Sequence, residues 1–388
     1  MEVEVFEKGP RPLAKVALTG GGRCNLTNSF RDVKSLTQVY PRGERLMKQL
    51  LKEWGHRETM QWFEERGVSL VIQKDECVFP RSQNAMQVVA TLLTAMQQNG
   101  VKLTLRHRLT DIHPEEKGFR LSFETPEGTT EQCFEQVVVT TGGAPRPAQL
   151  NFLRHLQLNY EPPVPSLFTL RIDCPPLLAL TGTVIREAEV MLTGTHFRAD
   201  GALLITHRGV SGPAILRLSS HAARHLAECN YKTTLCINWL GKTREEEARQ
   251  MLETMRSQSP KKQMGTIAPP PLTSRHWIML LKRSDTDPQM VWADLNGKRL
   301  SRLACMLTAD TYRIEGRDRH KEEFVTCGGV ALNSIDTRSL EAREHKGLYF
   351  AGEVLDVDAV TGGFNLQAAW TMGHTVAAHI QRTTECSI

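Results

Sequence analysis

Three glycines, Gly20–Gly22, are followed directly by Arg23, Cys24 and Asn25. The glycines leave the backbone bare, and the next three side chains offer a cation, a thiol and an amide. A thiol beside a reacting carbon can act as a general acid, although buried cysteines more often serve as inert packing. The segment therefore combines close backbone access with groups that can bind a ligand or move a proton.

Bare backbone follows apolar segments at several other places in the chain. We predict four strands that end in glycine, in VALTGGGRCN, VVVTTGG, FVTCGGV and LYFAGE with the following VTGGFN. In open α/β sheets the ligand lies beyond the carboxyl ends of the strands, where glycine lets the main chain approach it. Tight hairpin turns would favour Asn-Gly or Asp-Gly instead. The repeated pattern therefore indicates a ligand site.

Gly362 and Gly363 precede a predicted amphipathic helix that has Asn365 in its first turn. Unpaired N–H groups and the positive end of the helix dipole meet there. Phosphate is one ligand that suits such a place, and the N1/C2=O edge of a reduced flavin is another. An ordinary helix cap without any ligand is the third interpretation.

Glu7 ends the predicted strand VEVF near the start of the chain. In a dinucleotide-binding fold, an acid at the end of the second strand hydrogen-bonds the adenosine ribose. Exposed acids at strand ends are common, so Glu7 alone is a weak indication.

The composition is that of a globular protein of two or three domains. The 388 residues are 40% hydrophobic and 23% charged, and the formal net charge is +5. This mildly basic balance is compatible with an anionic partner but does not establish one. None of the nine cysteines forms a CxxC pair, and no signal peptide or membrane-spanning run is evident. We expect a protein of the reducing cytoplasm.

The elements that position these residues suggest one α/β domain interrupted by an insertion. We predict helices over 41–67 and 83–99, strands in 102–143, and a C-terminal helix from FNLQAAW onwards. Pro162 begins a proline-rich crossing that suits neither a central strand nor a helix. The expected boundaries are 1–160, 161–320 and 321–388, with the middle part β-rich over 165–240 and mainly helical over 241–310.

These motifs together resemble the bacterial BaiN/RdsA family of FAD-dependent oxidoreductases, formerly called the aminoacetone oxidase family. The resemblance rests on GGGRCNLTN, CVFP, VVVTTGG, LLITHRGVSGPAIL, FVTCGGV and GLYFAGEVLDVDAVTGGFNLQAAWTMG, in that order along nearly the whole chain. It implies a two-dinucleotide-binding-type FAD domain formed by both ends of the chain. It also implies an inserted β-barrel-like part with a helical part.

The resemblance implies a set of cofactor-binding residues. The ribose, diphosphate, ribityl chain and ring of FAD are expected at Glu7, Gly20, Gly21, Gly22, Arg23, Cys24, Asn25, Thr141, Gly142, Gly352, Glu353, Gly362, Gly363, Phe364 and Asn365. Arg23 could bind the diphosphate or hold the edge of the flavin, and the sequence does not choose between the two.

The resemblance also implies a reaction. Family members transfer hydride from NAD(P)H through FAD to a carbon–carbon double bond, some in uracil of ribosomal RNA to form dihydrouridine, others in unsaturated steroid-like rings. The proton could come from Cys24, Cys327 or His207, with Cys24 preferred. His207 and Arg208 are candidates for facing the substrate, while a plain turn residue remains the alternative for His207.

Two expectations concern the start of the chain and the substrate. The family's first strand and GxGxxG turn, about 25 residues, do not precede Glu7, so we expect an N-terminally truncated FAD domain with weakened FAD binding, and we hypothesise a misassigned start. The basic segments RLSRLACM, SRHWIMLLKR and SSHAARH favour structured RNA as partner. A small-molecule ene-reductase and an inactive flavoprotein remnant are the alternatives.

Overall fold

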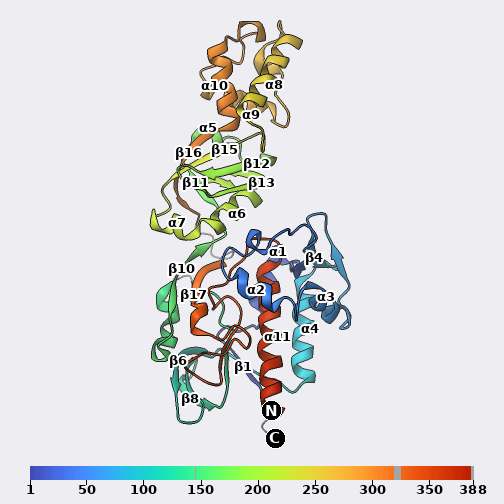
Figure 1. The fold of residues 1–388 in the computed structure, drawn as a ribbon. Helices are drawn as coiled ribbons and strands as arrows, with labels where there is room; N and C mark the ends of the chain where they lie inside the picture. Colours follow the sequence, from blue (N-terminus) through green and yellow to red (C-terminus); the bar gives the residue numbers. More distant parts are fainter. Residues whose placement is uncertain (145, 319–324, 386–388) are drawn as a thin grey trace. The chain divides into compact units, whose positions relative to one another are not determined.

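The computed structural model describes residues 1–144, 146–318 and 325–385. The chain divides into two compact units, Met1–Pro165 with Val325–Ile388, and Ser166–Phe324. We expected boundaries at 160 and at 320, and the second of these lies outside the described residues. Each unit has hydrophobic clusters of its own: two in the first unit and one in the second. Figure 1 shows their elements.

The first unit mixes helices with short strands from both ends of the chain. Its elements are β1 (Glu4–Glu7), α1 (Ala14–Gly22), β2 (Thr27–Asn28), η1 (Leu36–Gln38), α2 (Glu44–Leu50), α3 (His56–Glu64), β3 (Leu70–Ile72), β4 (Cys77–Pro80), α4 (Ala85–Gln98), β5 (Lys102–Leu105), β6 (Arg108–Pro114), β7 (Phe119–Thr125), β8 (Gly128–Phe134), β9 (Val137–Val139), η2 (Pro147–Leu156), β10 (Tyr160–Ser166), β17 (Val325–Val330), η5 (Leu332–Ser334), β18 (Leu348–Phe350) and α11 (Phe364–Glu385).

Two parallel strand pairs and one long helix organise this unit. Strand β1 pairs with β5, and β9 pairs with β18, in each case parallel. Helix α11 packs against α2 and α3 (Figure 1). It forms because Ala368, Met372, Val376 and Ile380 recur every four residues and are buried on one face. Although α11 has 22 residues, no helix in the described ranges is both long and apolar enough to cross a bilayer.

The strand predicted in VALTGGG is wrong, because these residues form helix α1. Ala14, Lys15 and Leu18 are strong helix formers, and Val16 is buried on the side that packs against α4. The regular helix stops where Thr19 becomes extended (ψ 147°) and Gly20 takes a left-handed conformation (φ 59°). Glycine thus ends a helix at this point rather than a strand.

The proline-rich crossing forms a strand, and this strand is not a central one, in agreement with the prediction. Tyr160–Ser166 is β10, which pairs with β17 in a two-stranded sheet. Proline is tolerated in such a strand because an edge strand need not donate hydrogen bonds on its outer side. Gly328 in β17 explains the close pairing, since a Cβ there would lie 2.6 Å from the Pro162 carbonyl oxygen.

The second unit is a closed six-stranded barrel with a group of helices. Its elements are β11 (Leu170–Ile172), α5 (Pro175–Leu178), β12 (Val184–Leu192), β13 (Arg198–Thr206), β14 (Gly209–Ser211), α6 (Pro213–His221), α7 (Ala223–Glu228), β15 (Thr234–Asn238), α8 (Glu245–Gln258), η3 (Met264–Thr266), α9 (Ser274–Arg283), η4 (Trp292–Asp294), α10 (Gly297–Thr308) and β16 (Asp310–Arg317).

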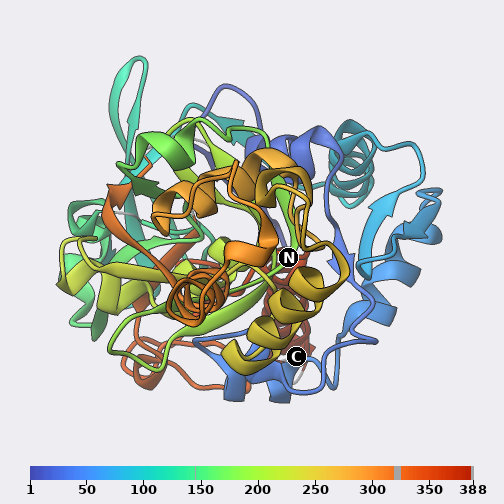
Figure 2. The ribbon, with the colours of Figure 1, turned by 90° about the horizontal axis from the view of Figure 1, so that it is seen from above.

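The barrel order is β11-β14-β13-β12-β15-β16. Its last strand, β16, follows the helices in sequence and closes the barrel between β15 and β11. Helices α8, α9 and α10 lie together in Figures 1 and 2. The chain therefore leaves the barrel after β15, forms this helical group, and returns to complete the barrel.

A buried polar cluster joins the last barrel strand to α9. Asp310 accepts hydrogen bonds from Trp239 Nε1 at 3.0 Å and from Arg283 Nη2 at 2.8 Å. Arg283 also stacks over the Tyr312 ring, 4.6 Å from its centroid. His276 of α9 packs its ring edge-on to Trp239 at 4.4 Å, and it is fully buried. Neither nitrogen of His276 has a hydrogen-bond partner among the residues that the structure describes, and burial lowers the pKa of this side chain to about 4.

His276 should make the second unit lose stability in mild acid. Its pKa is about 4 in the folded chain, against about 6.5 for an ordinary histidine side chain, so unfolding takes up a proton between these pH values. Lowering the pH from 7 to 5 should cost about 2 kcal/mol from this residue alone. We expect His276→Phe to remove that part of the pH dependence in urea unfolding.

His196→Phe, at an exposed position of the same unit, is the matched control and should keep the wild-type dependence. Burial raises the pKa of the Asp310 carboxyl, so this group makes the folded state more stable as the pH falls, opposite to His276. This contribution is the same in both variants and in wild type. An unchanged difference between pH 7 and pH 5 in His276→Phe would contradict the interpretation.

Candidate functional site

The start of α11 lies directly against the segment that follows the three glycines. A Cβ at Gly363 would overlap the Thr27 carbonyl oxygen, so only glycine allows this approach. With its amide oxygen facing Gly363, Asn25 accepts from the Gly363 N–H at 3.2 Å and donates to the Thr27 carbonyl at 3.0 Å. Asn28 Nδ2 donates to the Gly362 carbonyl at 3.1 Å. Two predicted ligand segments therefore meet here.

Residues 39–42 hold the same glycines through the loop that precedes α11. Tyr40 is fully buried and donates its hydroxyl to the Phe364 carbonyl at 3.0 Å. The Val360 N–H donates to the Val39 carbonyl at 2.9 Å. Arg42 forms an ion pair with Asp358, whose side chain is completely buried. Gly362 and Gly363 are therefore held between the contacts of residues 39–42 on one side and Asn25–Asn28 on the other.

Gln367 links α11 to two other elements from a fully buried position. Its Oε1 accepts from Thr27 Oγ1 at 2.6 Å, and its Nε2 donates to Thr59 Oγ1 and Thr371 Oγ1, each at 3.0 Å. Trp370 Nε1 adds a bond to the Leu26 carbonyl at 3.0 Å. A buried amide whose bonds are all satisfied fixes the register between its partners.

Glu353 connects three of the glycine-rich segments. Its Oε2 pairs with Lys15 Nζ at 3.2 Å, and its Oε1 accepts from the Thr326 N–H at 2.7 Å. A Cβ at Gly143 would overlap Thr326 Oγ1 and lie 2.5 Å from Glu353 Oε1. A Cβ at Gly142 would lie 3.6 Å from Lys15 Nζ.

Gly352, next to Glu353, contacts α11, since its N–H points to Met372 Sδ at 3.1 Å. We call the combination of Gly20–Asn25, Thr141–Gly143, Gly352–Glu353 and Gly362–Asn365 the glycine site. Helices α1 and α11 bring its four segments together. Lys15, Gly143, Thr326 and Gln367 were missed by sequence reasoning, because the partners that bring them into the site lie 27 to 340 residues away and no local pattern indicates them.

The three consecutive glycines have different roles. A Cβ at Gly20 would lie 2.9 Å from the Asn25 nitrogen and from the Phe79 ring, so Gly20 is required for packing. Gly21 and Gly22 have positive φ angles, and a Cβ at Gly21 would meet nothing within 4 Å. Arg23 lies over the Phe79 ring at 4.5 Å and donates to the Gly20 carbonyl at 3.0 Å. Backbone at Gly21 and Gly22 is therefore open to a ligand.

Several predicted residues have side chains that are already engaged. Asn365 donates to and accepts from the Ala359 backbone at 2.9 Å, so a ligand would meet its backbone rather than its amide. Glu7 Oε1 accepts from the Gly9 N–H at 2.6 Å. Gly328 and Gly329 serve close backbone packing within β17, where a Cβ at Gly329 would overlap the Val354 carbonyl oxygen.

The three candidate proton donors differ in their surroundings. Cys24 is fully buried in the cluster that contains Val16 and Leu26, and burial raises the pKa of its thiol to about 11. Cys327 is also fully buried, within β17. His207 is exposed in the turn between β13 and β14 of the second unit, beside Arg208, which pairs with Asp318 at 2.9 Å.

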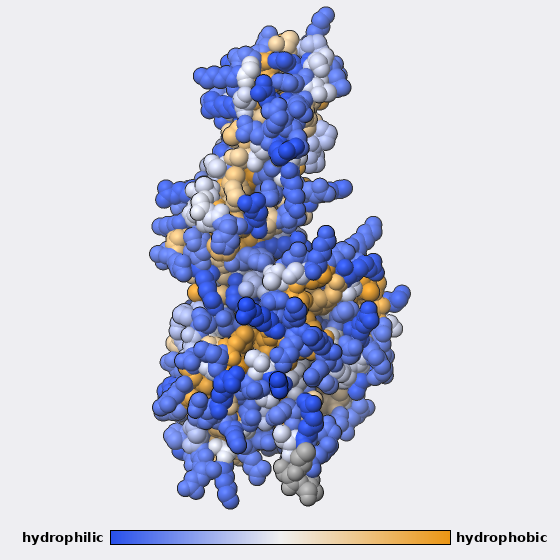
Figure 3. Space-filling model, in the orientation of Figure 1, coloured by the Kyte–Doolittle hydropathy of each residue, from blue (hydrophilic) through white to orange (hydrophobic). Residues whose placement is uncertain are grey.

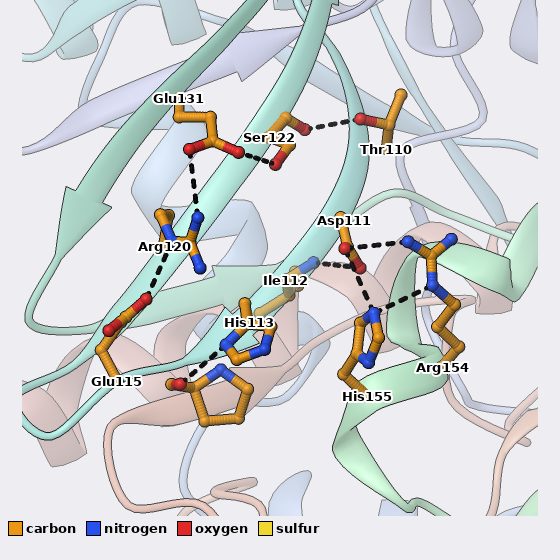
Figure 4. Close-up of polar contacts among 11 residues, drawn as sticks. Thr110, Asp111, Ile112, His113, Glu115, Arg120, Ser122, Glu131, Arg154 and His155 are labelled. Carbon is orange, nitrogen blue, oxygen red and sulfur yellow. Dashed lines mark hydrogen bonds and ion pairs between the residues drawn. The ribbon is translucent and has the colours of Figure 1, made fainter.

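A second group of polar residues covers β6–β8 and η2 (Figure 4). Arg120 bridges Glu115 at 2.8 Å and Glu131 at 3.2 Å, while Asp111 accepts from Arg154 at 3.0 Å. Opposite charges face each other throughout this group, and all but Asp111 of these side chains are at least 40% exposed. Exposed ion pairs of this kind contribute little to the free energy of unfolding. They belong to the surface of the sheet and do not indicate a catalytic site.

The family model described as "HI0933-like protein Rossmann domain" matches residues 1–379. The chain belongs to the HI0933-like family. It is thereby a Rossmann-type flavoprotein oxidoreductase with mixed α/β architecture and a six-stranded barrel, as the motifs predicted. Flavin is the cofactor of this class, and the glycine site is where the sequence predicts it.

Two relatives align over nearly the whole chain. The ribosomal RNA dihydrouridine synthase of Escherichia coli is 27% identical over 95% of this chain and 89% of its own length. The 3-dehydro-bile acid delta(4,6)-reductase of Clostridium scindens is 26% identical over 96% of this chain and 91% of its own length. Among solved structures, a 3-ketosteroid-delta4-(5alpha)-dehydrogenase from Rhodococcus jostii aligns with a TM-score of 0.46 at 12% identity, over 97% of this chain and 91% of that chain.

Gly143→Ala should disrupt the glycine site of this HI0933-like protein. The added methyl group must displace Thr326 or Glu353, which we expect to cost about 1–3 kcal/mol of unfolding free energy. The fraction of purified protein that carries flavin, read from the visible absorption spectrum, should fall at least several-fold.

Gly373→Ala on α11 is the matched control, since its Cβ would meet nothing within 4 Å. That variant should keep its flavin and gain about 0.5–1 kcal/mol from helix propensity. Equal flavin content in Gly143→Ala and wild type would show that Gly143 is not part of the flavin-binding site.

Proposed function

We propose that this protein is a flavin-dependent reductase that saturates the carbon–carbon double bond of uracil in ribosomal RNA, with NAD(P)H as reductant. The observation that carries the proposal is the set of contacts that links four glycine-rich segments through α1 and α11. The relatives named ribosomal RNA dihydrouridine synthase, at 26–27% identity over at least 95% of the chain, support the choice of substrate.

The glycine site fits a flavin dinucleotide in several respects. Open backbone at Gly21 and Gly22 lets a flat ring or a diphosphate approach closely. Lys15 is 73% exposed although it pairs with Glu353, so its ammonium group can also reach an anionic ligand. Leu18, immediately before the glycine turn, is 60% exposed and offers an apolar surface that a cofactor would cover.

The predicted roles follow from these positions. Lys15 and the first N–H groups of α11 would hold negative charge, and Glu353 would meet hydroxyl groups of the ribityl chain. When bound, the cofactor supplies hydride transfer from NAD(P)H to an electron-poor alkene carbon. The neighbouring carbon takes a proton from a side chain, which completes the addition of two hydrogens across the double bond.

Cys24 is the proton donor that we propose among the three candidates. Its raised pKa, caused by burial, keeps the thiol protonated at neutral pH, which suits an acid rather than a nucleophile. Its place beside Asn25 and the glycine turn puts it in the same segment as the predicted flavin contacts. The complete burial of the thiol is also what an inert packing cysteine would have.

A reductase of a small unsaturated ring is the second candidate function. The relative named 3-dehydro-bile acid delta(4,6)-reductase matches this chain over a similar length and at a similar identity. Both candidates share the flavin and the hydride chemistry, and they differ in whether the substrate is a polyanion.

Salt dependence separates the two substrates. An enzyme that tracks an RNA backbone should lose kcat/KM steeply as salt rises, because the counterion release that drives binding becomes less favourable at higher salt concentration. We expect a fall of at least about tenfold between 50 and 200 mM KCl, measured as dihydrouridine formed in unmodified ribosomal RNA. NAD(P)H-dependent bleaching of the flavin spectrum should change less than about twofold over the same range.

A flat salt profile together with rapid reduction of an unsaturated steroid ketone would favour the small-molecule function instead. Purified protein that neither carries flavin nor binds added FAD would overturn both.

Cys24→Ser tests the proposed acid. Serine is a far weaker acid, so uracil reduction should fall by about 100-fold or more while flavin reduction by NAD(P)H stays close to wild type. Cys133→Ser, at an exposed position of β8, is the control and should have no effect on either rate. If Cys24→Ser turns over like wild type and Cys327→Ser does not, the proton donor is Cys327.

A further inference from the structure

The net positive charge of this protein comes from the second unit. Residues 166–324 contain 23 Lys and Arg against 17 Asp and Glu, a net charge of +6. The remaining residues contain 25 against 26, a net charge of −1. The basic balance of the whole chain therefore belongs to the inserted unit, and a polyanion would be attracted to it.

Backbone hydrogen bonds hold two loops of the helical group side by side. The first loop comprises residues 260–264, after α8, and the second comprises residues 290–293, before α10. The Met264 N–H donates to the Met290 carbonyl at 2.8 Å, the Trp292 N–H to the Lys262 carbonyl at 3.0 Å, and the Ala293 N–H to the Pro260 carbonyl at 2.9 Å. Trp292 is fully buried beneath them and lies nearly parallel to Trp277, at a centroid distance of 6.3 Å. The first loop is therefore held next to the residues that lead into α10.

Four exposed cations stand on these two loops and on the first turn of α10. They are Lys261, Lys262, Lys298 and Arg299, which we call the basic platform. Among the described residues, no ion pair involves any of the four, and Arg299 makes only a 3.6 Å contact with Met290 Sδ. Three other cations of the helical group differ, because carboxylates neutralise Arg244, Arg249 and Arg302.

The acids near the basic platform do not balance it. Asp294 is exposed between the two loops, and Asp287 accepts from the Gln289 N–H at 2.9 Å. Arg256 adds a further cation, since its Nη1 donates to the Leu295 carbonyl at 3.0 Å and leaves its charge without a carboxylate. The platform thus keeps a local positive surplus.

The first turn of α10 is charged against its own dipole. It carries Lys298 and Arg299 and no acid, whereas the first turn of α8 carries three glutamates. Cations at a helix N-terminus are unfavourable for the helix, and anions are favourable. The arrangement becomes favourable when an external anion covers this turn, with the N-terminal N–H groups and both side chains directed at it.

We infer that the basic platform binds the phosphate backbone of structured RNA, and this inference rests on the proposed function. Lysine and arginine side chains presented singly on an exposed surface suit phosphate contacts, which fix position without reading bases. Exposed aromatic rings, on which unpaired bases could stack, are absent from the platform because Trp292 is buried. The platform therefore recognises the shape and charge of RNA, and base selection belongs to another part of the protein.

An anionic membrane is a poorer fit for this surface. Membrane-binding surfaces add exposed Trp, Phe or Leu to their cations. The exposed neighbours here are Pro260, Gln263, Ala293 and Asn296. In the view of Figure 3, the helical group is mostly hydrophilic.

The test compares two variants with the same loss of charge. In the platform variant, Lys261, Lys262, Lys298 and Arg299 are all changed to Gln. In the control variant, Arg171, Arg186, Arg198 and Lys232 are changed to Gln; these are exposed cations of the same unit for which the described residues show no ion pair. Thermal unfolding of both should match wild type, and the platform variant should gain slightly from relief of the α10 dipole.

Binding is measured by fluorescence anisotropy with a labelled hairpin transcribed from large-subunit ribosomal RNA, without NAD(P)H or turnover. We expect the platform variant to bind about tenfold or more weakly at 50 mM KCl, with the slope of log K against log salt reduced by about three to four. The control variant should stay within about twofold of wild type.

Equal weakening in both variants would mean that only net charge matters and would overturn the inference. So would wild-type binding by the platform variant, or platform-dependent binding to phosphatidylserine vesicles with none to RNA. A failure of the proposed function would give another result. In that case the wild-type protein would form no dihydrouridine in ribosomal RNA, regardless of how strongly either variant binds the hairpin.

Discussion

The first unit depends on the contact between Gly363 and the Thr27 carbonyl oxygen, which only a residue without a side chain permits. This contact joins segments from opposite ends of the chain, so it closes a very long loop at an entropic cost. The buried bonds of Gln367 to Thr27 and Thr59 offset that cost and fix the register. The predicted flavin contacts in Gly20–Asn25 and Gly362–Asn365 lie on the two segments that this contact joins, so their geometry depends on it.

The insertion leaves this contact undisturbed because of where it begins and ends. It follows β10 and precedes β17, and these two strands pair with each other. The two ends of the inserted unit are therefore adjacent, as they must be for a second hydrophobic core to fold within the chain without opening the first. Separate apolar clusters in the two units agree with this arrangement.

The sequence predicted the class of fold well because its glycines and long apolar periodicities are local signals. The α11 helix and the glycine turns at Gly21 and Gly363 belong to this group. Helix α1 was missed because AKVAL is apolar at both helical and strand spacing, so periodicity could not separate the two. The β10 strand was missed because proline excludes only central strands. Lys15, Gly143 and Gln367 act through partners distant in sequence, and no local pattern indicates such partners.

The division of charge between the units would let the affinity of this protein for a polyanion change without any change in the glycine site. The net charge of the first unit is close to zero, and its exposed Lys15 is paired with Glu353, so this unit offers little long-range attraction to a polyanion. Attraction must then come from the inserted unit, whose exposed cations can vary without touching any residue of the glycine site. Surface charges of this kind cost little stability to gain or lose. Under the proposed function, the preference of this protein for a polyanionic substrate would be set by a surface of the inserted unit, which has a core of its own.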